Sequence, residues 1–177
     1  MRFSPAAYRA RQFLLALRAQ PLTADELALV RSILTPDQMS LFLQMQFSEQ
    51  RHALNVLRTV QEWGENDPDL LTAALLHDLG KIRAPLRLWE RVLIVLGQTF
   101  APRRAAAWGD SPPQGWRRPF VVAARHPAWG GELASEAGTS PRAVSLILHH
   151  QSAEPAQLGD STAARLLQLL QKADHLN

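Results

Sequence analysis

The sequence predicts a single all-α domain, built as a bundle of helices. Apolar residues recur at intervals of three and four, as at Leu54, Leu57 and Val60, which is the spacing of one helix face. Helix-start signals recur along the chain, and no segment shows the strict alternation of apolar and polar residues that a half-buried strand has. A length of 177 residues suits one domain with one buried core.

Three helices are expected in the first third of the chain. A Ser-Pro pair opens the helix predicted over residues 4–18, and a Thr-x-x-Glu capping box opens the one over residues 23–34. A Thr-Pro-x-Gln sequence repeats that signal and begins the longest predicted helix, over residues 35–64, which carries His52.

The next helix, predicted over residues 70–79, is apolar nearly all round, as a buried central helix is. It ends at His77 and Asp78, and Gly80 lets the chain leave the helix. The segment 83–119 is the least regular part, with a helix expected over residues 86–100 and then a loop rich in Pro, Gly and Trp.

Four further helices are expected in the rest of the chain. We predict that His126-Pro127 breaks and restarts the chain, because a proline disfavours helical backbone in the residue before it. The expected helices cover residues 120–125, 127–137, 141–150 and 161–176.

Composition narrows the class of protein. The absence of cysteine excludes disulfides, thiolate metal sites and a cysteine nucleophile. We see no signal peptide and no apolar segment of membrane-spanning length, so a cytoplasmic protein is expected, with a peripheral membrane location left open. The net charge is only +3, and because Lys81 and Lys172 are the only two lysines in an arginine-rich chain, a lysine at position 81 stands out.

The pair His77-Asp78 places two metal-ligand types at the end of an apolar run, and Lys81 follows one turn later, where it can hold an anion. Taken alone, the stretch is equally consistent with a helix C-terminus whose His and Lys complement the helix dipole. The remaining histidines favour the first reading, because most fall in apolar helices where buried polar side chains need partners. They are His52, His126, His149, His150 and His175.

The order of these residues resembles the HD-domain superfamily of metal-dependent phosphohydrolases. Its minimal signature, H…HD…D, matches His52, His77-Asp78 and Asp174. The sequence HDLGKI over residues 77–82 is close to the HDIGK motif of the dinuclear HD-GYP branch. The expanded ligand set of that branch, and its HP-x-x-G turn, resemble His126-Pro127, Gly130, His149 and His150.

The resemblance covers roughly residues 50–177. It leaves residues 1–49 as N-terminal helices that pack on the core, and it makes the Arg- and Trp-rich segment at about 83–119 an insertion. It also implies an all-α fold with a metal site between central helices.

The resemblance implies a set of roles for the site. Asp78 would bridge two divalent metals, one held with His52, His77 and Asp174 and the other with His126, His149 and His150. Lys81 would contact a phosphate oxygen, and Asp78 and Lys81 would carry catalysis, in which a metal-bound hydroxide attacks a phosphate ester or anhydride. The substrate would be a small phosphorylated molecule, nucleotide-like. Ligands without thiolate suit Mn, Fe, Co, Ni or Mg, in one or two copies.

Two questions stay open in this reading. Consecutive helical residues point about 100° apart, so His149 and His150 both reach the site only if it is broad or the helix ends there. Otherwise one is a ligand and the other supports it from behind. In addition, no GYP motif follows these histidines, so we name no substrate.

Other assignments are weaker or compete with this one. Arg51 is a candidate substrate contact beside His52, although an arginine on a solvated helix face is the plainer interpretation, and His175 is not expected to be a ligand. The segment 83–119 fits a lid over an anionic substrate, a nucleic-acid patch, an acidic membrane surface or a partner subunit, although its nucleic-acid signal is not strong. A solvated surface in an arginine-rich protein is the plainer interpretation. Two functions compete with the enzyme: a non-catalytic helical signalling or binding module that retains the ligands, and a peripheral membrane or nucleic-acid binder that acts through this segment.

Overall fold

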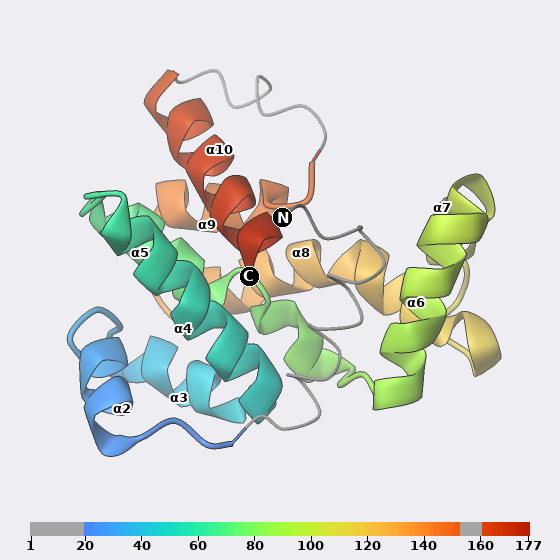
Figure 1. The fold of residues 1–177 in the computed structure, drawn as a ribbon, viewed down its shortest axis with the longest axis horizontal. Coiled ribbons are helices and arrows are strands. Elements are labelled where there is room, and N and C mark those ends of the chain that lie inside the picture. Colours follow the sequence, from blue (N-terminus) through green and yellow to red (C-terminus); the bar gives the residue numbers. More distant parts are fainter. Residues whose placement is uncertain (1–19, 153–160) are drawn as a thin grey trace, which may run out of the picture.

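The computed structural model describes residues 20–152 and 161–177, and within them every regular element is a helix, as predicted (Figure 1). The predicted helix over residues 4–18 lies outside the described residues. The elements in chain order are α2 (Ala24–Arg31), α3 (Pro36–Gln44), α4 (Phe47–Glu62), α5 (Pro68–Leu76), η1 (Leu79–Arg83), α6 (Leu88–Phe100), α7 (Pro102–Gly109), η2 (Gly115–Arg117), α8 (Arg118–Glu136), α9 (Pro141–His149) and α10 (Ser161–Leu176).

The predicted helix starts are confirmed where the chain supplies a side-chain cap. Thr23 and Thr35 each form a complete capping box, with the side chain of the third helical residue accepting from the backbone N–H of the threonine. The Asp67 carboxylate accepts from the first turn of α5, and the Ser140 hydroxyl accepts from the first turn of α9. These starts are local in origin, which is why the sequence alone reveals them.

The predicted continuous helix over residues 35–64 is wrong. The chain breaks between α3 and α4, where Met45 and Gln46 have extended backbone. The Gln50 side chain donates to the Met45 carbonyl over 2.9 Å, and Met45 itself is buried in the core. Because neither glycine nor proline marks this break, tertiary packing decides it.

A second correction concerns His126-Pro127, which does not interrupt the chain. Helix α8 runs continuously from Arg118 to Glu136 with Pro127 inside it and, at 19 residues, is longer than α4 at 16. The loop expected after residue 100 contains α7 and η2. The helix predicted over residues 70–79 ends earlier, at Leu76, and η1 follows it.

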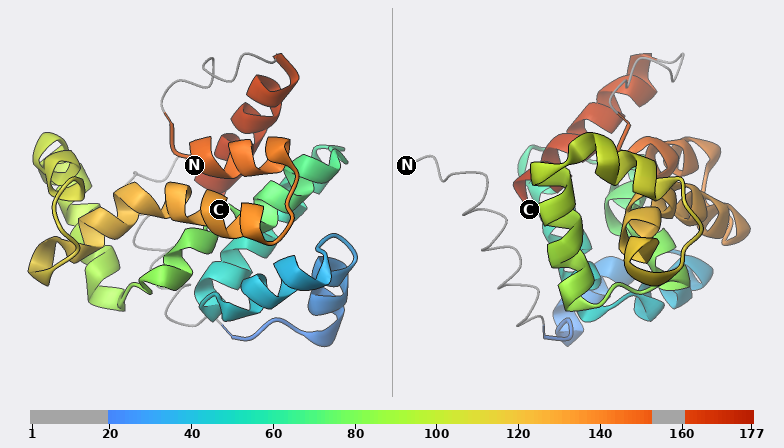
Figure 2. Two further views of the ribbon diagram at one scale, coloured as in Figure 1. Left: turned by 180° about the vertical axis from the view of Figure 1, so that it is seen from behind. Right: turned by 90° about the vertical axis from the view of Figure 1, so that its right-hand side faces the viewer.

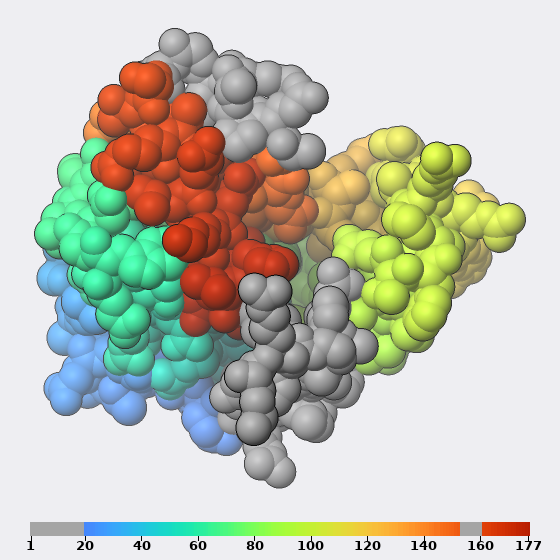
Figure 3. Space-filling view, turned by 45° about the horizontal axis from the view of Figure 1, so that its top comes forward, coloured from blue at the N-terminus to red at the C-terminus, as the bar shows by residue number. Residues whose placement is uncertain are grey.

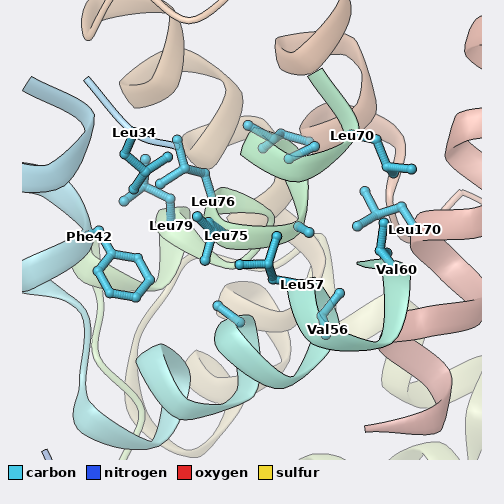
Figure 4. Close-up of a cluster of buried hydrophobic side chains, with 14 of the residues drawn as sticks. Leu34, Phe42, Val56, Leu57, Val60, Leu70, Leu75, Leu76, Leu79 and Leu170 are labelled. Atoms are coloured by element: carbon cyan, nitrogen blue, oxygen red, sulfur yellow. The ribbon is translucent and has the colours of Figure 1, made fainter. Parts of the chain in front are cut away.

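A single apolar core lies around α5 and the facing sides of α3, α4, α9 and α10 (Figure 4). Fully buried leucines dominate it, among them Leu57, Leu75 and Leu170. Leu34 and Phe42 bring the turn after α2 and helix α3 into the same core. Burial of these side chains supplies the main favourable term for folding.

Helices α6 and α7 form an arm (residues 88–109) that stands to one side of this core (Figures 1 and 2). The arm rests on the first half of α8, where the Phe120 ring lies against Gly97 and Ala124 lies against Gly109. The space-filling view shows the surface hollowed between α10 and the arm (Figure 3).

Candidate metal centre

The centre of the site is the junction of α5 and η1. His77 caps the C-terminus of α5 and Asp78 follows it, and both side chains are buried. Gly80 does not serve as a left-handed helix end, since its φ is not positive. It is a glycine because a Cβ there would lie 1.9 Å from the His126 carbonyl oxygen and 2.6 Å from the Gly130 nitrogen. Gly80 and Gly130 therefore let η1 sit directly on α8.

The first ligand group joins three helices and consists of His52, His77 and Asp174, from α4, the end of α5 and α10. His52 Nε2 lies 2.8 Å from Asp174 Oδ1, and His77 Nε2 lies 3.6 Å from the same oxygen. Two imidazole nitrogens thus converge on one carboxylate oxygen.

The second ligand group consists of Asp78, His126 and His150, all buried. Asp78 Oδ1 lies 3.3 Å from His126 Nε2 and 4.0 Å from His150 Nε2. The other oxygen, Oδ2, lies 3.7 Å from His77 Nε2, which belongs to the first group. Asp78 therefore stands between the two groups, with one oxygen facing each.

Backbone carbonyls hold the three buried rings in one orientation. Nδ1 of His77 lies 3.1 Å from the Ala74 carbonyl, and Nδ1 of His150 lies 2.7 Å from the Ile147 carbonyl. A carbonyl oxygen only accepts hydrogen bonds, so Nδ1 of each ring carries the hydrogen. In the neutral ring, Nε2 then presents its lone pair to the site.

Pro127 provides the same support for His126. A proline has no N–H to donate to the carbonyl four residues back, which here is that of Ala123. His126 Nδ1 lies 3.0 Å from this carbonyl oxygen and 3.1 Å from that of Val122. The helix continues through the proline, and a freed carbonyl orients a ligand-type histidine.

The donor atoms fit a divalent cation. His77 Nε2 is buried without a hydrogen-bond partner, which is costly unless something else satisfies it. Nε2 of His126 and Nε2 of His150 lie 3.2 Å apart, although neither carries a hydrogen when both rings are neutral. Two lone pairs at this separation repel each other, and a cation held by both nitrogens would remove that repulsion.

The electrostatics of the site also favour a positive ion. Burial alone would lower the pKa of His77, but the negative charges of Asp78 and Asp174 raise it to about 9. Burial would raise the pKa of Asp78, yet the Lys81 ammonium holds it well below its usual range. Burial and the neighbouring histidines lower the pKa of His150 to about 3, so its ring is neutral and able to ligate.

Lys81 extends the site toward the surface. Its Nζ donates to Asp78 Oδ2 over 2.6 Å and lies 3.4 Å from Glu49 Oε2. Burial would lower the pKa of Lys81, but the two carboxylates raise it, so the side chain stays an ammonium. With Glu49 it also lines a surface pocket, together with Gln44, Met45, Gln46, Ile82 and Pro85.

Glu49 is a functional candidate that the sequence reading missed. Its buried carboxylate also accepts from Arg91 of α6, so it ties the arm to the site through Lys81. An acidic residue in the first turn of an amphipathic helix is ordinary surface composition, and only its burial separates it from the exposed glutamates.

Two predicted site residues lie apart from both groups. His149 is half-buried and its Nδ1 lies 2.8 Å from the Ser145 carbonyl, while its neighbour His150 enters the second group. Helix α9 ends at His149, and the roughly 100° between successive side chains is enough to separate the two rings. Arg51 pairs with Glu26 of α2, away from the ligand groups. His175 belongs to neither group.

The sequence of the chain was compared with known protein families. The family model of the HD domain matches residues 50–177. The chain belongs to the HD domain family. No curated protein and no solved structure matches it. The matched span contains both ligand groups, and it begins two residues before His52.

Membership in the HD family carries a general expectation about chemistry. Proteins with this domain are generally hydrolases that bind divalent metals, and the two His/Asp groups here are able to hold such ions. In the described part of the chain, no helix combines the length and apolar character needed to cross a membrane.

Proposed function

We propose that the chain is a metal-dependent phosphohydrolase that cleaves a phosphate ester or anhydride, with nucleotide-like molecules as the favoured class. The observation that carries the proposal is the position of Asp78. One of its oxygens faces His126 and His150, and the other faces His77 and accepts from Lys81. A carboxylate shared between two ligand groups, with a cation on one edge, suits a site where charge on a phosphoryl group must be balanced.

The ligand assignment follows the two groups. His52, His77 and Asp174 would hold one divalent ion, and His126 and His150 would hold a second, with Asp78 between them. When bound, such ions lower the pKa of a water molecule and neutralise charge on a phosphoryl oxygen. The four imidazole rings form a continuous row, with neighbouring centroids 5.1–5.2 Å apart, so the two groups adjoin.

Lys81 would bind the substrate phosphate. An ammonium has three N–H donors, and at most two point to Asp78 and Glu49. The side chain is 22% exposed, so its remaining donor is within reach of an incoming anion. Asp78 and Glu49 keep the pKa of Lys81 high, which makes it a source of positive charge rather than a proton donor.

A metal-reconstituted activity screen tests this function. The protein is loaded with Mn, Fe, Co, Ni or Mg and assayed against cyclic dinucleotides, nucleoside triphosphates, nucleoside monophosphates and guanosine tetraphosphate. We expect at least one substrate to be hydrolysed with at least one metal, detected as the linear dinucleotide, the dephosphorylated nucleotide or the released phosphate species, and Asp78→Ala abolishes this hydrolysis.

A histidine within the second ligand group is compared with one outside both groups. His126→Gln is expected to lower the rate at least about 100-fold, while the control His175→Gln keeps the wild-type rate. If a metal-loaded protein hydrolyses none of these substrates, or Asp78→Ala retains full activity, the proposal fails.

A further inference from the structure

Helix α6 exposes part of its apolar side to solvent. Trp89, Val92, Leu93, Leu96 and Phe100 follow the i, i+3, i+4, i+7, i+11 spacing of one helix face, which we call the α6 stripe. Three of its side chains are strongly exposed: Trp89 at 52%, Leu96 at 47% and Phe100 at 81%. The fully buried residue of this helix is the charged Glu90.

Polar contacts fix this inverted orientation. Glu90 accepts from Arg118 of α8, and Arg91 donates to Glu49 of α4. Gly97, on the same side of the helix as Glu90, lies against Phe120. Glu90 and Gly97, with the apolar Ile94 between them, therefore face the domain, and Trp89, Leu96 and Phe100 of the α6 stripe face outward. A helix packed only for stability would bury the opposite face.

The segment that contains the α6 stripe carries an excess of positive charge, although Arg83, Arg91 and Arg118 within it are paired with glutamates. Residues 83–119 contain seven arginines and two acidic residues, a net charge of +5, whereas the whole chain carries +3, which leaves −2 for all other residues. Exposed arginines lie at both ends of the helix in the chain, Arg87 just before it and Arg103 and Arg104 just after it, and Arg117 lies beside the exposed Trp116 ring.

From these observations we infer that the α6–α7 arm is a docking surface for an anionic membrane, with the α6 stripe lying in the interface and the arginines on lipid headgroups. An interfacial helix needs an apolar face with aromatic residues, flanked by basic ones, and no membrane-spanning length. At 13 residues, α6 is about 20 Å long, which suits a helix that lies in the surface plane.

The charge and the side-chain types of the arm favour a membrane over a second copy of the chain or a nucleic acid. A second copy of the chain would bring another +5 segment against the first, which repulsion disfavours. A nucleic acid would engage the arginines, but it offers no apolar phase for Val92, Leu93 and Leu96. A lipid bilayer satisfies both the charge and the aliphatic surface.

Vesicle sedimentation with the full chain tests the inference. Sucrose-loaded vesicles of phosphatidylcholine are compared with vesicles that also contain phosphatidylglycerol. We expect binding to the anionic vesicles only, weakening as salt is raised. Equal partitioning onto both kinds of vesicle, or onto neither, overturns the inference.

Matched variants locate the surface. Leu96→Gln is expected to lower the partition coefficient about tenfold, from the loss of apolar burial, and Arg104→Gln about fivefold, from the loss of one surface charge. The controls are Leu176→Gln, which removes a leucine of similar exposure from α10, and Arg31→Gln, which removes an exposed arginine from α2. If the controls lose as much binding as the arm variants, the arm is not the docking surface.

Two further measurements distinguish other occupants. Light scattering of vesicle-free protein is expected to show a monomer. A dimer that Leu96→Gln dissociates would assign the α6 stripe to a second copy instead.

Hydroxyl-radical labelling is expected to modify Trp89 and Phe100 in free protein, and anionic vesicles are expected to suppress this modification. Protection of both residues without vesicles, or a preference for oligonucleotides over vesicles, contradicts the membrane assignment.

Discussion

The metal centre and the α6–α7 arm break the usual rule of burial in opposite directions. The centre buries His77, Asp78, His126 and His150, which are residue types that normally stay near water. The arm exposes large apolar side chains on α6 that normally enter a core. Both regions depart from what stability alone would select.

The two regions meet these costs differently. In the centre, buried groups satisfy each other or backbone carbonyls, with His77 Nε2 as the exception within the described residues. In the arm, the apolar stripe has no such compensation, and the polar side of α6 is tethered by ion pairs to α4 and α8. In each region a binding partner would offset this cost: a cation at the metal centre and a membrane surface at the arm.

The largest predicted difference in stability is between a substitution in the core and one in the arm. Leu75→Ala removes a fully buried side chain and is expected to lower the free energy of unfolding by about 2–5 kcal/mol. Leu96→Ala, in the α6 stripe, should cost less than about 0.5 kcal/mol. Urea denaturation measures both variants. A cost for Leu96→Ala as large as that of Leu75→Ala would show that the stripe is buried in solution.

The next effect tests the contact that brings η1 onto α8. Gly80→Ala places a methyl group against the His126 carbonyl, and we expect a loss of about 1–3 kcal/mol together with weaker metal binding. Gly131→Ala is the matched control, because the three atoms nearest to its added Cβ all belong to the Leu148 side chain, whereas Gly80 meets backbone. Thermal unfolding and metal titration compare the two. Equal effects of both variants would show that the approach of η1 to α8 is not what positions the ligands.

A smaller effect concerns the link between the two regions. Glu49→Gln removes a charge that holds Lys81 and Arg91, and it should lower kcat about tenfold with metal content unchanged. Glu132→Gln, which breaks the exposed pair with Arg83, is the control and should leave kcat as it is. A fall in metal content that matches the fall in rate would place Glu49 among the ligands rather than behind Lys81.

The smallest effect lies outside both regions, at Glu26 of α2. The hydrogen bond from Arg51, with help from the Thr23 backbone and from Arg58, lowers the pKa of Glu26 from 4.5 to about 2. A lowered pKa stabilises the fold above the unfolded value of about 4.5, and this contribution is lost as pH falls toward 2. Glu26→Gln should therefore cost about 1 kcal/mol at neutral pH and nothing near pH 2.

Denaturant titrations across this pH range measure that difference. A destabilisation by Glu26→Gln that stays constant from pH 7 to about pH 2 would mean that the ion pair with Arg51 is not its origin.

The sequence predicted the parts of the molecule that local chemistry determines. The capping boxes at Thr23 and Thr35 begin helices as expected, and the order of histidines and aspartates indicated the family that the comparison then confirmed. The break at Met45 was missed because packing makes it, without glycine or proline. The continuity of α8 was missed because the cost of Pro127 is offset by the side chain of His126.

Other parts of the site could not be predicted from the sequence alone. Helical periodicity alone left open whether His149 and His150 both reach the site, and the end of α9 selects His150. Glu49 resembled any surface glutamate until the fold buried it between Lys81 and Arg91. These features arise from contacts between residues far apart in the chain.

Metal content tests the central claim most directly. Wild-type protein and Asp78→Asn are reconstituted with each candidate divalent metal and freed of excess ion. The metal bound per protein molecule is then measured by elemental mass spectrometry. The two ligand groups predict about two equivalents in the wild type. Asp78→Asn should retain much less, because it removes the charge that stands between the groups. A wild-type protein that retains no divalent metal under any of these conditions would contradict the account.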